Sequence, residues 1–232
     1  MGTERCRAGW RLLQLAVAFL GCVVATGAQI SPVAGAPFTA TRVHTSPDGV
    51  TVQAKIARAS NGSVYEEIPD VRPGHLPLAS ILDIANHRRV FLRGDTKTYT
   101  VQPDHTVPRT LDVSDAAVQE RVERFRGLPP RHDVDGEQEA DVVPIGLRVV
   151  EGQTEYGMRR TFVKLAATSK LRERVWEMWD RPSLMLTVET VGIDDAGRPA
   201  SITKLTNIQA VEPDARLFEI PADYTPSTPQ RH

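Results

Sequence analysis

One short part of the chain gathers side chains that could bind a metal ion or move a proton. This part consists of the eight residues 132–139, and five of them are potential ligands: His132, Asp133, Asp135, Glu137 and Glu139. A calcium loop needs ligands at alternate positions, a glycine at the sixth position and a bidentate glutamate at the twelfth. Gly136 directly follows the second aspartate, so this spacing is not met. The polar composition instead predicts a solvated loop from Arg131 to Asp141 that connects two parts of a sheet.

The other histidines are scattered along the chain, at positions 44, 75, 87, 105 and 232. None forms a His-x-His or His-Glu-x-x-His pair, which would place two metal ligands on one face of an element. There is also no Gly-x-Ser-x-Gly elbow and no glycine-rich phosphate loop. We therefore expect no catalytic site, no metal and no cofactor. A hydrolase with a site dispersed over loops is a weaker alternative than a binding protein or a regulatory module.

The first 28 residues have the layout of a secretory signal peptide. Three arginines precede an apolar run over residues 12–25, and small residues follow it. A basic start, a short apolar run and a small-residue exit are typical of export signals, and a spanning helix needs about 20 apolar residues. We predict cleavage between Ala28 and Gln29, which gives a soluble chain in the periplasm or cell envelope.

Cys22 supports a second interpretation of the leader. The sequence Phe19-Leu20-Gly21-Cys22 approximates a bacterial lipoprotein box, in which Cys22 would be lipidated and would anchor the chain to a membrane. The other cysteine, Cys6, also lies in the leader, so the mature chain has no thiol for a disulfide or a nucleophile. The net charge of −1, with both signs evenly mixed, argues against a nucleic-acid partner.

Most of the mature chain is predicted to form β-strands. Apolar and polar residues alternate from Val50 to Arg58, and Asn61-Gly62 separates this run from the next one at 63–68. Asn-Gly between two such runs predicts a hairpin, because both residues tolerate positive φ. Further strands, separated by short turns, are predicted at residues 80–84, 89–93, 97–101, 146–150, 157–165, 171–179, 184–191 and 200–209.

One amphipathic helix is predicted, with Asp112 or Ser114 as its N-cap and Gly127 at its end. Val118, Val122 and Phe125 fall on one stripe, which we expect to pack on the sheet. Many strands with short connections and a single helix predict an α+β fold with an antiparallel sheet.

Two tryptophans lie three residues apart in a predicted strand. Trp176 and Trp179 should point to opposite faces, because successive side chains of a strand alternate. One of the two rings could therefore face a ligand cavity. The alternative, that both rings serve core packing with one partly exposed, is the more usual outcome.

Several short motifs lie between Ile81 and Tyr224. They are Ile81-Leu82-Asp83, Arg89-Val90-Phe91, Lys97-Thr98-Tyr99, Glu177-Met178-Trp179 with Pro182 and Leu184, Lys204 to Ile208, Glu212-Pro213-Asp214 and Leu217 to Tyr224. Together they resemble a group of exported bacterial proteins, of the acidobacterial kind, whose fold is similar to the outer-membrane lipoprotein carrier (LolA-like) superfamily. Phe218 and Ile220 alternate with Glu219, so we expect them to attach the chain end to a face of the sheet.

The resemblance implies a strongly curved antiparallel sheet, an unclosed half-barrel, with one or a few helices on its concave side. In that superfamily the concave hollow can hold acyl chains, so the leading hypothesis is an exported, non-enzymatic protein that binds a lipid or another apolar ligand. The alternative is an envelope-stress sensor or regulatory module that binds an envelope protein. No ligand-binding residue maps onto this chain. The expected organisation is a signal peptide (1–28), a flexible lead (29–37), one domain (38–225) and a disordered tail (226–232).

Overall fold

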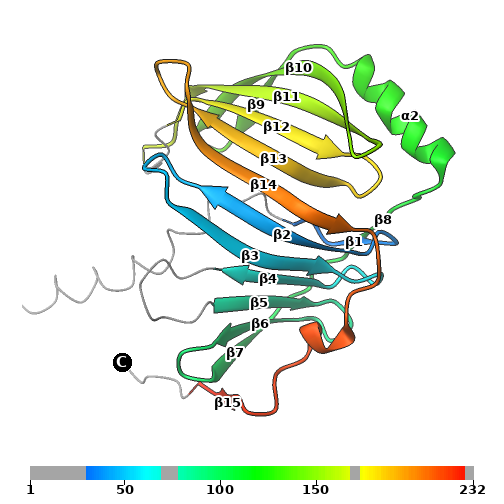
Figure 1. The fold of residues 1–232 in the computed structure, drawn as a ribbon, viewed down its shortest axis with the longest axis vertical. Coiled ribbons are helices and arrows are strands. Elements are labelled where there is room, and N and C mark those ends of the chain that lie inside the picture. Colours follow the sequence, from blue (N-terminus) through cyan, green and yellow to red (C-terminus); the bar gives the residue numbers. More distant parts are fainter. Residues whose placement is uncertain (1–29, 69–77, 168–172, 228–232) are drawn as a thin grey trace, which may run out of the picture.

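The computed structural model of the chain describes residues 30–68, 78–167 and 173–227. In these residues thirteen strands form one curved sheet that does not close, in the order β15-β7-β6-β5-β4-β3-β2-β14-β13-β12-β11-β10-β9 (Figure 1). All neighbours are antiparallel except the short β15, which runs parallel to β7. A second, two-stranded sheet pairs β1 with β8. The predicted α+β class and the open, curved antiparallel sheet are confirmed.

The elements follow one another in the chain with short connections, as the sequence predicts. Their bounds are β1 Val33–Ala34, β2 Phe38–Thr45, β3 Thr51–Arg58, β4 Val64–Ile68, β5 Leu78–Asp83, β6 Arg88–Arg93, β7 Thr98–Pro103, β8 Arg109–Thr110, α2 Asp115–Arg126, β9 Arg131–Asp135, β10 Gln138–Val150, β11 Gln153–Lys164, β12 Val175–Arg181, β13 Leu186–Ile193, β14 Pro199–Gln209, the 3-10 helix η1 Ala215–Phe218 and β15 Thr225–Pro226.

The hairpin predicted at Asn61-Gly62 is present between β3 and β4. Gly62 has a φ of +90°, and a Cβ there would lie 2.6 Å from the Cβ of Pro108, so glycine is needed for both conformation and space. The strand predicted at 184–191 begins two residues later, at Leu186, because residues 182–185 form the turn after β12.

The prediction of a polar loop from Arg131 to Asp141 is wrong. These residues form the hairpin of β9 and the start of β10, with Gln138 paired to Asp135 across a turn in which Gly136 has a φ of +59°. Charged residues are common on edge strands, because they prevent pairing with other chains. β9 is such an edge, so its composition resembles that of a loop.

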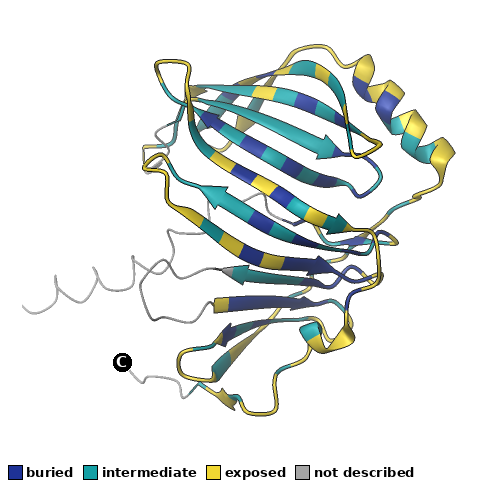
Figure 2. Cartoon of the chain, viewed as in Figure 1, coloured by how far each residue is buried: buried dark blue, intermediate teal, exposed yellow. Residues whose placement is uncertain are grey.

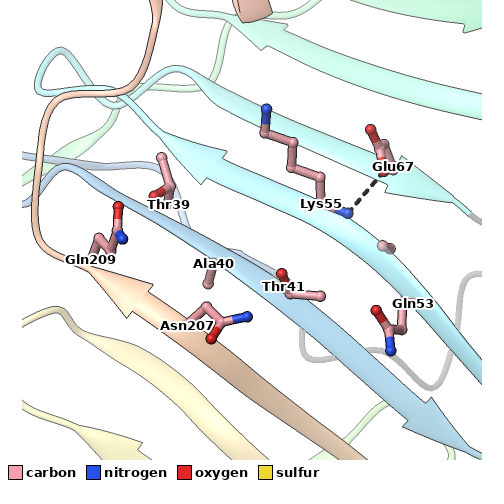
Figure 3. A pocket seen from close by; sticks show the side chains of 9 residues that line it. Thr39, Ala40, Thr41, Gln53, Lys55, Glu67, Asn207 and Gln209 are labelled. Carbon is pink, nitrogen blue, oxygen red and sulfur yellow. Dashed lines mark hydrogen bonds between the residues drawn. The ribbon is translucent and has the colours of Figure 1, made fainter.

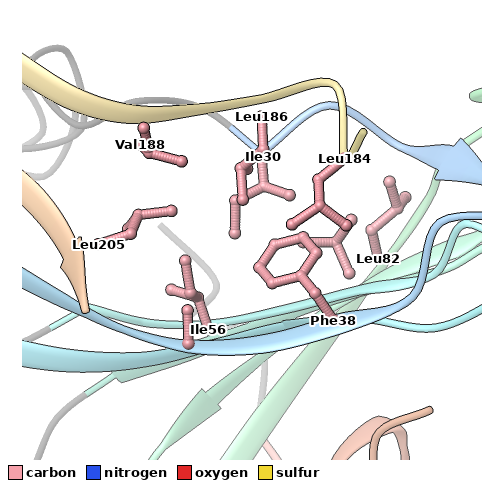
Figure 4. Close-up of a cluster of buried hydrophobic side chains, with 10 residues drawn as sticks. Ile30, Phe38, Ile56, Leu82, Leu184, Leu186, Val188 and Leu205 are labelled. Carbon is pink, nitrogen blue, oxygen red and sulfur yellow. The ribbon is translucent and has the colours of Figure 1, made fainter. Parts of the chain in front are cut away.

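The main core lies on the concave face of the sheet, which we define as the face that carries Phe38, Ile56 and Leu205. Figure 4 shows the sheet bending around this cluster, with Leu186 and Val188 of β13 opposite Phe38 and Ile56. Phe38 and Ile56 are fully buried. The cluster is completed by Ile30, Ala40, Val64, Leu82, Leu184, Leu186, Val188 and Leu205.

The expectation of a flexible lead at 29–37 does not fit the described part of that segment. Ile30, Val33 and Ala36 are buried, and Ile30 belongs to the concave core. The backbone of Gly35 donates to the carbonyl of Ser60 at 2.9 Å. Pro, Gly and Ala made the segment look like a linker, but its apolar residues complete the core.

A second cluster lies on the opposite, outer face of β4–β7. Its buried residues are Ala79, Ile81, Val90 and Leu92, and the C-terminal segment covers them with Phe218, Ile220 and Tyr224. The predicted attachment of the chain end to a sheet face is therefore confirmed. Two residues of the predicted tail belong to the fold, because Pro226 pairs with β7 as part of β15 and the backbone N–H of Ser227 donates to the carbonyl of Tyr99. Residues 228–232 lie outside the described residues.

Helix α2 begins and ends where the sequence predicts. Ser114 is its N-cap and accepts a hydrogen bond from the backbone of Ala117, and the helix ends at Gly127. Val122 and Phe125 are buried against the sheet, whereas most of the helix is exposed (Figure 2). Within the described residues, no helix combines the length and the apolar character needed to cross a bilayer.

Candidate functional site

The concave face continues from the core onto β10–β12, where its side chains are larger and less covered. The strand register places Met158, Met178, Thr190 and Thr203 in one row across β11–β14. Thr203 alternates with Leu205 of the core, so this row lies on the same face. On β11, Tyr156, Arg160 and Phe162 share the face by the same alternation.

The large side chains of this surface are only partly buried, unlike those of the concave core. Met158, Phe162, Trp176 and Met178 all retain partial exposure, whereas Phe38 and Ile56 have none. Helix α2 contacts β10 and β11, and its two buried residues cover one end of this surface. We call the surface formed by Met158, Arg160, Phe162, Trp176 and Met178 the upper concave face.

Two donors on the upper concave face lack an acceptor. Arg160 of β11 and Trp176 of β12 are direct cross-strand partners. The Nε of Arg160 and the Nε1 of Trp176 are both buried and make no hydrogen bond. The guanidinium of Arg160 lies over the ring of Phe162, with its central carbon 5.1 Å from the ring centroid. Buried polar groups without a partner are uncommon in native proteins, so each one needs an explanation.

A half-buried carboxyl, that of Asp180, lies where α2 meets the sheet. Phe125 of the helix stacks on Tyr156, with ring centroids 4.1 Å apart. Tyr156 is the cross-strand partner of Asp180, and the hydroxyl of Thr187 donates to Asp180 at 2.5 Å. Burial raises the pKa of Asp180, and the hydrogen bonds from Thr187 and Tyr156 oppose the rise. Burial, together with the Asp180 charge, raises the pKa of Tyr156 to about 12.

The other face of β10–β12 is held together by an ion network. Glu155 is 1 % exposed and accepts from Arg181 and from Arg148, each at 2.8 Å. Arg148 also pairs with Glu189 at 2.5 Å and lies 4.1 Å from the centroid of the Trp179 ring. Breaking such a buried network is costly, because it leaves a charge without compensation. We interpret it as the structural tie between these strands.

Trp176 and Trp179 do point to opposite faces of β12, as their spacing predicts. Trp179 packs on Gly157, where a Cβ would lie 2.9 Å from the indole ring, so a side chain at position 157 would displace the ring. The register shift between β12 and β13 follows Trp179 and interrupts the alternation there, so the Trp179 ring also packs against the main core. Trp176 lies on the upper concave face, beside Arg160. No sequence motif marks Arg160, although large side chains repeat at alternate positions of β11 from residue 156 to residue 162.

A groove of about 410 Å³ lies on the outer face, across β14, β2, β3 and β4 (Figure 3). Its lining is mostly polar, with Gln53, Asn207 and Gln209 as amides and Lys55 as the cation. Asn207 has a φ of +53° and stands in a register shift of β14 against β2. A bulge of this kind bends the strand and re-aims its side chains. The groove lies outside the concave face and is not apolar.

The residues that first suggested chemistry do not form a site. His132 contacts Asp141 at 2.9 Å and Glu139 at 3.8 Å, on the exposed edge hairpin. His87 and His105 have ring centroids 6.1 Å apart and are both exposed, and His44 bonds to Thr203. The described ranges contain no group of three histidine, cysteine or acidic residues that could hold a metal ion. His75, His232, both cysteines, Ala28 and Gln29 lie outside those ranges.

Comparison with protein-family models and with curated proteins finds no match. Solved structures do match. An uncharacterized conserved protein from Thermus thermophilus has a TM-score of 0.49 at 11 % identity, over 83 % of this chain and 90 % of that one. MucB of Pseudomonas aeruginosa, in its complex with MucA, has a TM-score of 0.44 at 14 % identity, over 81 % and 56 %.

A LolA superfamily protein from Nitrosomonas europaea also matches, with a TM-score of 0.27 at 6 % identity, over 80 % of this chain and 90 % of that one. The solved neighbours thus include a LolA superfamily protein and MucB. This chain spans little more than half the length of MucB. The acidobacterial part of the resemblance receives no support. At such low identities and scores the likeness is one of shape and transfers neither ligand nor partner.

Proposed function

We propose that the protein is an exported, non-enzymatic envelope protein that binds a lipid or another amphipathic molecule on the upper concave face. One observation carries the proposal: on the same face of the same sheet, the large side chains of the core around Phe38 are buried, whereas Met158, Phe162, Trp176 and Met178 retain partial exposure. The core around Phe38 is filled by the chain's own Ile30. The surface around Met158 and Met178 is partly exposed.

The composition of the upper concave face suits an apolar chain. Methionine side chains are flexible and polarizable, and they adapt to ligands of irregular shape. Met158 and Met178 are direct cross-strand partners, with the rings of Phe162 and Trp176 on the same strands. Ligand sites are commonly apolar surfaces that carry a few polar groups, and here Arg160 supplies one.

Binding is tested by native mass spectrometry of the protein purified from its own envelope, and by calorimetric titration with short-chain lipids. We expect a co-purifying lipid mass that Met158→Glu removes, because a charge on this surface must be desolvated when an apolar chain binds. Val143→Glu is the matched control, since Val143 is 41 % exposed on the outer side of the neighbouring strand β10. Equal binding by both variants would place the ligand elsewhere.

The second candidate is a regulatory module that binds an envelope protein. Exposed aliphatic side chains gather near the β9 end of the sheet and include Val134 at 65 % and Val163 at 56 % exposure. Exposed apolar side chains that lie together are typical of interaction surfaces. Site-specific photo-crosslinking in cells at Val163, compared with the distant Val50, tests this candidate. A defined protein adduct only at Val163 would favour it over the lipid proposal.

A further inference from the structure

We infer that the bound amphiphile carries an anionic oxygen in its head group and that Arg160 and Trp176 hold that oxygen. The inference rests on the proposed function and names the chemistry of the ligand. Carboxylates and phosphates both present such an oxygen, so both classes fit.

The two donors belong to directly paired residues of neighbouring strands. Arg160 and Trp176 are opposite each other on β11 and β12, and Cβ atoms of directly opposite residues lie about 4.5–5.5 Å apart. The Arg160 Nε and the Trp176 Nε1 are buried and unpaired, so each has lost its hydration without gaining an acceptor. Because both nitrogens are covered, the two side chains must move apart to admit a ligand oxygen, which would then satisfy both donors.

The charge of Arg160 selects an anion. Its neighbour Arg159, on the outer face of the same strand, pairs with Glu177 at 2.5 Å. In the described part of the chain Arg160 has no such carboxylate, and its guanidinium rests on Phe162. A guanidinium without a counter-ion on a partly covered apolar surface favours a carboxylate or phosphate, to which its hydrogen bonds are strong.

The position of the head group is restricted by Glu173. A Cβ on Gly192, the partner of Trp176 on β13, would lie 3.2 Å from the carboxyl carbon of Glu173. An anion on that side of Trp176 would be repelled. The head group therefore belongs on the β11 side of Trp176, next to Arg160, and the apolar chain extends over Met158 and Met178.

The test is a calorimetric titration of the full mature protein with four probes, of which the three amphiphiles are kept below their critical micelle concentrations. Lauric acid and lauryl phosphate carry the anionic oxygen and a chain, dodecyl maltoside carries the same chain without a charge, and inorganic phosphate carries the charge alone. We expect the two anionic amphiphiles to bind at least about tenfold more tightly than dodecyl maltoside, the size of one charged hydrogen bond. Inorganic phosphate, without a chain, should bind far more weakly than lauryl phosphate.

The variants Arg160→Gln and Arg159→Gln are compared, since they lie on opposite faces of one strand. Arg160→Gln should lower the affinity for lauric acid at least about tenfold and change that for dodecyl maltoside by less than about twofold. Arg159→Gln should change neither. Trp176→Phe, which keeps a ring and removes one donor, should weaken lauric acid binding by a smaller factor of about threefold.

The outcomes separate the inference from the proposed function. If dodecyl maltoside binds as tightly as lauric acid, or if both arginine variants act alike, the inference is overturned and amphiphile binding stands. If no chain-bearing probe binds, the proposed function fails and the inference fails with it. A loss confined to Arg160→Gln and to the anionic probes supports both.

Discussion

The two halves of the sheet differ in how completely their faces are covered. Strands β2–β7 have apolar clusters on both faces, one closed by Ile30 near the N-terminus and the other by Phe218 and Tyr224 near the C-terminus. Strands β9–β12 have an ion network on one face and, on the other, a helix that buries only Val122 and Phe125. The segments at the two ends of the described chain thus cover one half, and the side chains of the upper concave face in the other half stay partly exposed.

Two arginines on the concave face show the same contrast at the level of single side chains. Arg58 lies 5.0 Å above the Phe38 ring and Arg160 lies 5.1 Å above the Phe162 ring. Arg58 is fully buried and donates to the carbonyls of Ser31, Ala36 and Leu184, whereas the Nε of Arg160 has no acceptor. The first arginine fixes the chain. The second is the group that, in our proposal, binds the anionic oxygen of the ligand.

The largest expected effect is on stability in the closed half. Phe38→Ala should lower the free energy of unfolding by about 3–5 kcal/mol, because it leaves a cavity in a packed core. Phe162→Ala, on the same face of the other half, should cost less than about 2 kcal/mol, since its ring is partly exposed. Urea unfolding of both variants measures the difference. Equal losses would show that the two halves are packed alike.

Arg58→Ala should cause the next largest loss of stability. Burial lowers the pKa of Arg58 to about 10. In the variant the three carbonyl groups that Arg58 contacts would lose their donor, which costs about 1–3 kcal/mol of stability for each unsatisfied buried group. We expect a total loss of about 3 kcal/mol in urea unfolding, and faster hydrogen exchange at Gly35. The exposed Arg198→Ala serves as control and should change stability by less than about 0.5 kcal/mol. Unchanged exchange at Gly35 would contradict the proposed role of Arg58.

Loss of the N-cap of helix α2 should destabilise the helix itself rather than the whole fold. Ser114→Ala removes the side chain that caps the Ala117 N–H, which should cost about 1 kcal/mol. We expect faster hydrogen exchange in residues 115–126 and little change in β2–β5. Loss of protection in both regions would mean that the helix is part of the main cooperative unit.

The smallest expected effect depends on pH. The folded-state pKa of Asp180 is raised above its unfolded value of about 3.9. Its contribution to stability is therefore fully present below the unfolded pKa and is lost as pH rises through the folded pKa. The groups that face it are Tyr156 and Thr187, with the Arg121 charge acting on Tyr156.

Asp180→Asn should remove this loss, because an amide has no charge to desolvate. Carboxyls with lowered pKa values, such as Asp214 at about 2 through its hydrogen bonds with Arg216, produce the opposite trend in both proteins. The difference in unfolding free energy between wild type and variant, measured from about pH 3.5 to about pH 7, isolates the Asp180 contribution. A difference that does not grow with pH would exclude a raised pKa.

Much of the fold follows from local pattern. The alternation in β3, the Asn61-Gly62 turn and the stripe of α2 depend on neighbours in the chain, so the sequence predicted them. The β9 hairpin was missed because edge strands and loops share a polar composition. The role of residues 30–36 was missed because small residues and prolines do not reveal what a segment will pack against.

The sequence by itself determined the class of the fold, the number and order of most strands and the opposite orientation of Trp176 and Trp179, since alternation along a strand is a local property. Only the tertiary structure decided that Arg160 meets Trp176 without an acceptor while Arg58 meets three carbonyls. These pairings depend on strand register and on which segment returns to cover each half of the sheet. Such contacts join residues distant in the chain, and no local pattern specifies them.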